Sequence, residues 1–412
     1  MPTEILQPDL PSDGAVALVD APDDAVAVEI PNASRAPHRR VLHIINGESY
    51  AGAERVQDLL ALCLPEFGYD VEFACLKDGK FAQARRSQST PLVTTPMRSR
   101  FDLRAARALA RRVRAGNVDI IHTHTPRSAM IGRIVSALTG VPLVHHIHSP
   151  TVRDSTHRVS NWVNALVERL SIAKAPGVIS VSQAMQRYTE EHRLSGQHMA
   201  VVPNGVPRTG PLAERPTPQG VWTIGTIALF RPRKGLDVLI EAIARLRQQG
   251  YAVRLCAVGT FESPDYETQT KQLVDKLGVA DAVEWRGFRS DVIAELKGMD
   301  LFVLPSLFGE GLPMVILESM STGVPVVATD VEGIPEAIRD GQEGVIVAAG
   351  DAGALARGIG RVVDGDVDWQ TLRRNAYERQ QEFYTDVAMA RGVANVYDTV
   401  LKNQTKRPAK HR

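Results

Sequence analysis

The sequence has few cysteines, no long apolar run and almost no net charge, and each shortage excludes a class of protein. Its three cysteines, Cys63, Cys75 and Cys256, are too few and too far apart for a disulfide framework or a zinc site. No stretch approaches the ~18 consecutive apolar residues that a membrane-spanning helix needs. A formal net charge of +1 gives no electrostatic argument for a nucleic-acid partner. These shortages favour a globular protein of the reducing cytoplasm.

The two ends of the sequence differ in composition from the rest. Residues 1–37 are acidic and rich in proline and alanine, and they lack the basic start and apolar core of a secretory signal. We expect this segment to be a disordered lead-in. Residues 402–412 form a basic tail that we also expect to be disordered.

Between these ends, short β-rich runs alternate with helical patterns in two halves. Residues 207–220 between the halves are rich in proline and glycine without periodicity, which is typical of a linker. We predict an α/β fold with two doubly wound, Rossmann-like domains, 38–206 and 221–383, that face a central cleft with the carboxyl ends of their strands. A C-terminal helix over 384–401 is expected to cross back to the first domain.

Two glutamates stand in the otherwise apolar segment FGEGLPMVILES, residues 308–319. Glu310 follows a predicted strand, and Glu318 lies in a helix that begins near Pro313, because proline fits a first helical turn. Ionised carboxylates accept hydrogen bonds from sugar and ribose hydroxyls, so the pair suits a nucleotide sugar. The alternative is that acids near a helix N-terminus simply favour the helix dipole.

Cations and free amides accompany these acids. The first helical amides, those of Met314 and Val315, favour a phosphate. Arg231, Arg233 and Lys234 stand between a predicted strand and a helix, where three cations could neutralise a diphosphate at the same sheet edge. A solvated basic turn is the alternative interpretation.

Gly52 opens a predicted helix in the segment NGESYAGAERV, residues 46–56. The segment resembles a phosphate-binding turn but lacks the G-x-G-x-x-G spacing of a dinucleotide site. We expect Gly52 to let the backbone approach a ligand closely.

These segments resemble, in kind and in order, those of glycosyltransferase family 4, the retaining enzymes of the GT-B fold. The family's signature is a pair of glutamates separated by seven residues, and Glu310 and Glu318 have that spacing. The resemblance covers about residues 40–400. The other matching segments are AGAERV (51–56), DIIHTHT (119–125), VHHIHS (144–149), ISVS (179–182), VVPNGV (201–206), RPRKG (231–235), EWRG (284–287) and TDVEGIPEAI (329–338).

The resemblance implies a role for each matching position. Glu318 is expected to bind the ribose hydroxyls of the nucleotide, and Glu310 to face the donor sugar. Lys234 is expected on the diphosphate, which the amide of Gly52 approaches. His148 is expected near the transferred sugar and the leaving phosphate.

Four further positions complete the substrate-binding residues that the resemblance implies. His124 and Asn204 match positions that line the cleft. Gly311 and Leu312 stand in the EGLP segment between the two glutamates.

Two positions depart from the family pattern. An arginine usually stands five residues before the lysine, and here that position is Leu229. Either Arg231 or Arg233 is expected to supply the second charge, and the sequence leaves the choice open. Pro313 replaces a common glycine and removes one amide donor, so we expect phosphate contacts at the next two amides.

Five histidines, including His122 and His124, fall within residues 122–148, which raises the question of a metal site. Alternation along a strand sends His146 and His148 to one face and His145 to the other, and no carboxylate stands nearby in the sequence at ligand spacing. We therefore expect no metal.

A basic helix is predicted over residues 98–114, and such helices are usually solvated. The resemblance also implies that a basic face of the first domain can rest on anionic lipid and receive a lipid-linked acceptor. One acid, Asp102, stands against seven arginines: Arg98, Arg100, Arg104, Arg107, Arg111, Arg112 and Arg114.

Taken as a whole, the resemblance implies a metal-independent, retaining transferase without a cofactor. It would move a hexose from a UDP- or GDP-linked sugar to a glycan or lipid-linked acceptor in cell-surface or exopolysaccharide synthesis. The expected catalytic residues are His148, Glu310, Lys234 and Arg231. Two alternatives stay open: a GT-B epimerase would release free sugar from the donor alone, and a non-catalytic subunit would bind the donor without transfer.

Overall fold

The computed structural model describes residues 38–99, 102–153 and 158–405. The predictions for residues 1–37, Arg100 and residues 406–412 therefore lie outside the described residues. The predicted disordered tail is wrong over residues 402–405, because the last helix continues to Thr405.

The first half of the described chain forms a seven-stranded parallel sheet in the order β3-β2-β1-β4-β5-β6-β7. Its central strands are buried along nearly their whole length, as expected for a parallel sheet that helices cover on both faces. The strands are β1 (Arg39–Ile45), β2 (Tyr69–Cys75), β3 (Leu92–Thr94), β4 (Ile120–Thr123), β5 (Leu143–Ile147), β6 (Gly177–Ser180) and β7 (Met199–Val201).

Helices connect these parallel strands. In α4, the side chain of Thr125 caps the first turn by accepting from the Ser128 amide, and the helix ends at Gly140 with a φ of 78°. The predicted basic helix is wrong over the described residues 98–99 and 102–103, because α3 begins only at Arg104. The helical elements are α1 (Gly52–Cys63), η1 (Leu64–Phe67), α2 (Lys80–Ala84), α3 (Arg104–Ala115), α4 (Pro126–Thr139), η2 (Thr151–Arg153), α5 (Arg158–Ile172) and α6 (Gln183–Glu191).

The second half forms a six-stranded parallel sheet in the order β10-β9-β8-β11-β12-β13. Its strands are β8 (Trp222–Ile227), β9 (Val253–Val258), β10 (Val283–Gly287), β11 (Leu301–Leu304), β12 (Val326–Thr329) and β13 (Gly344–Val347). Its helical elements are η3 (Pro232–Lys234), α7 (Leu236–Gln248), α8 (Pro264–Leu277), η4 (Ala280–Ala282), α9 (Val292–Lys297), α10 (Met314–Thr322), α11 (Ile334–Ala337), α12 (Ala352–Val363), α13 (Trp369–Phe383) and α14 (Asp386–Thr405). The predicted α/β class with two Rossmann-like sheets is confirmed, whereas the predicted domain boundaries stay predictions.

The strand order reverses once in each sheet. In the first sheet β1 pairs with both β2 and β4, and in the second β8 pairs with both β9 and β11. Ligands of such sheets bind outside the carboxyl ends of the strands at this switch point. The segments that follow β1, β4, β8 and β11 are therefore where a site is expected.

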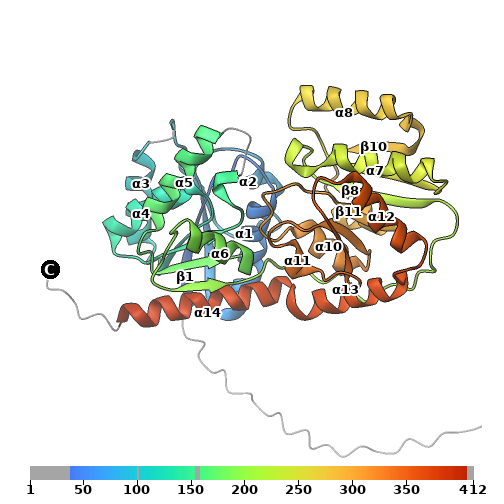
Figure 1. The fold of residues 1–412 in the computed structure, drawn as a ribbon. Coiled ribbons are helices and arrows are strands. Elements are labelled where there is room, and N and C mark those ends of the chain that lie inside the picture. Colours follow the sequence, from blue (N-terminus) through green and yellow to red (C-terminus); the bar gives the residue numbers. More distant parts are fainter. Residues whose placement is uncertain (1–37, 100–101, 154–157, 406–412) are drawn as a thin grey trace, which may run out of the picture. The chain divides into compact units, whose positions relative to one another are not determined.

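Packing connects the two halves. The last helix, α14, lies against the first half (Figure 1), where Val396 and Val400 contact Gly177 and the Tyr69 hydroxyl donates to Asp398 at 2.6 Å. The larger of the two buried apolar clusters combines β1 and β2 with α10, including Ile316. Among the described helices, none has both the length and the apolar character needed to cross a bilayer.

Candidate active site

The loops that follow β8 and β11 are packed against each other at the switch point of the second sheet. The Leu307 amide donates to the Arg233 carbonyl at 2.8 Å. Gly235 has a φ of 65°, and a Cβ there would lie 2.1 Å from the Pro305 carbonyl oxygen. Only glycine fits this contact, which holds the basic residues of one loop beside the acid of the other.

Glu310 forms the centre of a buried charge cluster. Its Oε1 accepts from the Ser306 hydroxyl at 2.6 Å and from the Lys234 ammonium, and Arg233 Nη1 lies 3.7 Å away. Burial alone would raise the pKa of Glu310, but Lys234 and Arg233 outweigh it and hold this pKa below its ordinary value. Burial also lowers the pKa of Lys234, and Glu310 offsets part of that effect. The structure thus brings together three of the predicted site residues.

A second glutamate holds the loop that carries Glu310. Glu332 has a φ of 41°, in the left-handed region, and its carboxylate accepts from the amides of Gly309 at 3.1 Å and Glu310 at 2.7 Å. The sequence reasoning assigned no role to Glu332. The sequence feature that could have pointed to Glu332 is the segment TDVEGIPEAI, which contains it and matches the family.

The first half contacts the next residues of this loop. A Cβ on Gly311 would lie 1.9 Å from the His148 carbonyl oxygen, so the two backbones touch. The Ser182 hydroxyl donates to the Gly311 carbonyl at 3.1 Å, and Asn204 Nδ2 donates to the Leu312 carbonyl at 2.8 Å. His148 and Asn204 thus lie at the glutamate segment, where their contacts are with backbone, and their predicted roles toward the substrate stay predictions.

The other glutamate of the pair, Glu318, is buried in α10 and pairs with Arg55 of α1. Both guanidinium ends donate to the carboxylate, with Arg55 Nη1 at 3.3 Å from Oε2. Burial works against the charge of Arg55, but Glu318 raises the pKa of this arginine above its ordinary value. The sequence reasoning missed Arg55, although AGAERV contains it.

Gly52, the first residue of α1, lies one turn before Arg55. A Cβ at Gly52 would meet no atom of the described residues within 4 Å. Packing inside the protein therefore does not require glycine here, and the predicted approach to a ligand stays a prediction.

The two candidates for the missing family arginine lie in different places. Arg233 reaches the Glu310 cluster and also donates to the Gly309 carbonyl at 3.0 Å. Arg231 lies near enough to Lys234 to lower the pKa of that lysine, but its guanidinium pairs with Glu262 at 3.5 Å. Leu229 is 43% exposed and outside the cluster. The geometry favours Arg233 as the second cation.

The N-terminus of α10 lies between the two glutamates in the sequence. The helix begins at Met314 after Pro313, and the Ile316 amide donates to the Pro313 carbonyl at 3.2 Å. The amides of Met314 and Val315 are the first two of the helix, so they have no acceptor within it. These are the amides predicted to contact a phosphate.

The polar groups at the switch point of the first sheet are imidazoles. His43 of β1 pairs in register with His122 of β4, and with His124, His146 and His148 they form a packed cluster with ring centroids 4.2–5.6 Å apart. Burial lowers the pKa of all five rings, to about 3 for His43 and His148, so the rings are neutral. The sequence reasoning missed His43. The feature that could have revealed it is its position in β1 opposite the HTH segment that begins in β4.

The remaining histidine, His145, faces away from this cluster, as alternation predicted. It contacts the Thr123 hydroxyl at 2.8 Å and Glu168 of α5 at 3.2 Å. Glu168 is distant in the sequence and comes close to His145 only in the fold, so sequence spacing could not reveal this carboxylate.

Two trios of imidazole nitrogens lie within 4.8 Å of one another and could act as metal ligands: His43, His122 and His124, and His124, His146 and His148. Neither trio contains a carboxylate or thiolate, so a dication would be buried without a compensating charge. The absence of a metal site stays a prediction.

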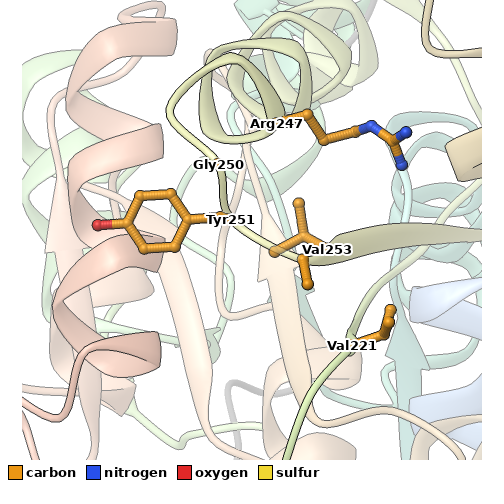
Figure 2. Close-up of a pocket in the computed structure, with 6 residues that line it drawn as sticks. Val221, Arg247, Gly250, Tyr251 and Val253 are labelled. Atoms are coloured by element: carbon orange, nitrogen blue, oxygen red, sulfur yellow. The ribbon is translucent and has the colours of Figure 1, made fainter.

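A separate hollow of about 270 Å³ lies at the opposite edge of the second sheet. It is lined by Val221, Arg247, Gly250, Tyr251 and Val253, and the side chains of Arg247 and Tyr251 point away from each other (Figure 2). Val221, Gly250 and Tyr251 precede β8 or β9, and Val253 is the first residue of β9, so the hollow lies at the amino ends of these strands. The hollow is therefore not part of the candidate active site.

Comparisons with known proteins agree with this arrangement. The model of glycosyltransferase family 4 matches residues 50–209, and that of glycosyl transferases group 1 matches residues 213–382. The chain is 28% identical over 296 residues to a phosphatidyl-myo-inositol mannosyltransferase of Mycobacterium leprae, covering 71% of this chain and 76% of that protein. It is 33% identical over 184 residues to the putative colanic acid biosynthesis glycosyltransferase WcaL of Salmonella typhimurium, covering 42% of this chain and 44% of that one.

Among solved structures, the chain is similar to Anabaena Alr3699/HepE in complex with UDP and glucose. The TM-score is 0.76 at 23% identity, over 88% of this chain and 100% of that one. This likeness shows the GT-B fold. Since the two family models together span nearly all of the described residues, the chain belongs to glycosyltransferase family 4 and is a glycosyltransferase.

Proposed function

We propose that this glycosyltransferase moves a hexose, with retention of configuration, from a nucleoside-diphosphate sugar to a glycan or lipid-linked acceptor in cell-surface or exopolysaccharide synthesis. The observation that carries the proposal is the buried cluster of Glu310, Lys234 and Arg233 at the switch point of the second sheet. An ionised acid for sugar hydroxyls and two cations for phosphates stand within one cluster. The acid, Glu310, precedes the first residue of α10 by four positions.

Departure of a nucleoside diphosphate needs charge stabilisation more than covalent chemistry. In the proposed mechanism Lys234, Arg233 and the first amides of α10 stabilise the leaving diphosphate. Glu310 orients the hexose, and Glu318 accepts hydrogen bonds from the ribose. Retention follows from attack on the face that the diphosphate leaves, with the leaving phosphate accepting the proton of the acceptor hydroxyl. The reaction so described uses protein cations where other enzymes use a metal.

The relatives suggest the classes of donor and acceptor. Alr3699/HepE was solved with UDP and glucose, and the mycobacterial relative is named as a mannosyltransferase that acts on phosphatidyl-myo-inositol. WcaL is named for colanic acid biosynthesis. We propose a UDP- or GDP-linked hexose as donor and a polysaccharide or lipid-linked intermediate as acceptor.

Exposed arginines and exposed apolar side chains on adjacent helices of the first half support the proposal of peripheral contact with an anionic membrane. Arg104, Arg107 and Arg111 are exposed on α3, whereas Arg112 pairs with Glu72. The neighbouring helices add exposed apolar side chains, since α4 packs on both α3 and α5. These are Leu138, Trp162, Leu166 and Leu170, the last three spaced four residues apart along α5. Equal sedimentation with neutral and anionic vesicles would remove this part of the proposal.

The test of the proposed function is a thermal-shift screen of UDP-, GDP- and ADP-sugars, with and without EDTA. We expect one nucleotide to raise the melting temperature by several degrees, with no effect of EDTA, and Glu318→Ala to abolish the rise. Glu336→Ala is the matched control, because Glu336 also joins the halves by accepting from the amides of Gln183 and Ala184. Absence of stabilisation by every nucleotide sugar would overturn the proposal, and release of free sugar epimers from donor alone would favour an epimerase.

A further inference from the structure

Four of the five clustered histidines form one hydrogen-bonded chain with Tyr397 of α14. His148 Nε2 lies 2.9 Å from His124 Nδ1, and His124 Nε2 lies 3.3 Å from His43 Nδ1. His43 Nε2 lies 3.3 Å from the Tyr397 hydroxyl, which lies 2.6 Å from His122 Nδ1. The chain thus runs from the glutamate segment, at His148, to the last helix of the protein.

Each contact in this chain holds one proton. Burial lowers the pKa of the four rings and raises that of Tyr397, so every imidazole carries a single N–H and the phenol keeps its O–H. A ring that donates through one nitrogen must accept through the other. Only two proton arrangements therefore satisfy all four contacts, and they differ in whether Tyr397 donates to His122 or to His43.

The distances favour one of these arrangements. Bonds from an O–H donor are shorter than those from an N–H donor, and the contact of Tyr397 with His122 is 0.7 Å shorter than its contact with His43. If Tyr397 donates to His122, then His43 donates to Tyr397, His124 to His43, and His148 Nε2 to His124. The Nδ1 atom of His148 then carries a lone pair, and among the described residues this buried atom meets no hydrogen-bond partner.

We propose that Tyr397 is a positioning residue that fixes His148 as the tautomer protonated on Nε2, so that Nδ1 accepts a hydrogen bond from a hydroxyl of the transferred sugar. The inference rests on the proposed function, which brings the sugar to His148. It also assigns a use to the contact of α14 with the first half. The helix supplies the hydroxyl that sets the direction of donation in all four hydrogen bonds.

The first test is the tautomer of His148 in the wild-type protein. Imidazole ¹⁵N shifts and couplings of the full chain, labelled at histidine, report which nitrogen carries the proton, and His148→Gln assigns the signal. We expect a protonated Nε2 and a bare Nδ1. A proton on Nδ1 would overturn the proposal without any variant, and this measurement does not depend on which nucleotide sugar the protein binds.

The second test compares Tyr397→Phe with Tyr69→Phe. Tyr69 packs on Tyr397 with ring centroids 5.0 Å apart, and its hydroxyl donates a hydrogen bond to Asp398. This hydroxyl therefore lies near Tyr397 but takes no part in the series of hydrogen bonds that leads to His148. The probe is release of nucleoside diphosphate from the nucleotide sugar that stabilises the wild type. We expect Tyr397→Phe to move His148 toward the Nδ1-protonated tautomer and to lower kcat about tenfold, the equivalent of one hydrogen bond, with the donor KM within about twofold.

Equal tautomer populations and equal kcat in the two variants would overturn the role of Tyr397. If Tyr397→Phe does not fold, the wild-type tautomer decides. If no nucleotide bound the wild type, the proposed function would be overturned instead. The tautomer of His148 could still be measured in that case.

Discussion

The switch points of the two sheets hold buried polar groups of opposite kinds. At the first sheet, His43, His122 and their neighbours are buried side by side with no opposite charge among their contacts in the described residues, and burial lowers their pKa until they are neutral. At the second sheet, Glu310 is equally buried but has Lys234 and Arg233 beside it, and its pKa is lowered in the direction that keeps it ionised. The same topology thus presents neutral hydrogen-bonding groups on one side and fixed charges on the other.

The two switch points differ in charge state because their neighbouring charges differ, since the side chains are buried to a similar depth. Desolvation always disfavours the charged form, and it wins where every neighbour would carry the same sign. Where an opposite charge lies within hydrogen-bonding distance, attraction offsets desolvation. Under the proposed function, the second half would supply the charges that stabilise the leaving group and the two carboxylates that bond hydroxyls, whereas the first half would add neutral imidazoles as hydrogen-bonding groups.

Low pH is expected to give the largest effect, and this effect should come from the histidine cluster of the first sheet. The unfolded chain binds protons at histidine near pH 6.5, whereas the folded pKa of His43 and His148 is about 3, so acid favours unfolding. From pH 7 to 5.5, each of the five clustered histidines should cost about 1 kcal/mol, in total about 5 kcal/mol of the free energy of unfolding. Urea denaturation at both pH values measures this loss.

A variant sharpens this first prediction. His146 has both ring nitrogens buried and, among the described residues, without a hydrogen-bond partner. His146→Phe should therefore reduce the acid-induced loss by about 1 kcal/mol. His198→Phe, outside the cluster, is the control. An acid-induced loss that is the same in both variants would show that the cluster does not set the acid sensitivity.

The two arginines of the basic loop are expected to differ in turnover. Arg233→Ala removes a cation beside Glu310 and should lower kcat about 30-fold, or about 2 kcal/mol in the transition state. Arg231→Ala removes the partner of Glu262 and should change kcat less than about threefold. Release of nucleoside diphosphate measures both. The reverse order of effects would mean that Arg231 supplies the charge missing at Leu229.

The ion pair between the halves is expected to contribute less than a fully buried one. Arg55→Ala leaves Glu318 buried without its cation, but Arg55 is 29% exposed, so the loss of stability should be about 2 kcal/mol. A double-mutant cycle with Glu318→Ala in urea denaturation should give a coupling of about 1 kcal/mol or more. Additive losses would show that the two side chains do not interact in solution.

The hydrogen bond from Ser306 to Glu310 is expected to give the smallest effect. Ser306→Ala removes one of the groups that bond the carboxylate, at a cost of about 1 kcal/mol of stability. Thr322→Ala removes a half-buried hydroxyl that bonds the Ser319 carbonyl within α10, and it is the control for loss of a hydroxyl away from the charges. A larger loss in Thr322→Ala would mean that Ser306 does not support the ionised acid.

Local patterns predicted the sheets and the polar residues that directly follow their strands. Lys234, Arg233 and Glu310 were recognised because each follows a strand, and parallel strands bring their carboxyl ends to one edge. The helix start at Met314 followed from Pro313. The limits of the basic helix did not follow from composition, because Asp102 bonds the amides of Arg98 and Arg104 before the helix begins.

Contacts between distant residues could not be predicted in this way. Arg55 is 263 residues from Glu318, and no periodicity connects them. Glu332 acts on the backbone of a loop that precedes it by two elements, and His43 joins the cluster only through its register with His122. Each of these residues stands in a segment that the sequence had marked or lies in a predicted strand, but its partner depends on the fold.

The most direct test of the account is titration calorimetry of UDP and GDP with the wild type, Lys234→Met and Lys271→Met. Lys271 is an exposed lysine of α8 that pairs with Glu267, so its variant removes an equal charge from the surface. We predict that one nucleotide binds the wild type and the Lys271 variant within about twofold, and binds Lys234→Met at least about tenfold more weakly, because a cation on the diphosphate is lost. Equal affinity in all three proteins would contradict the assignment of the charged cluster to the diphosphate.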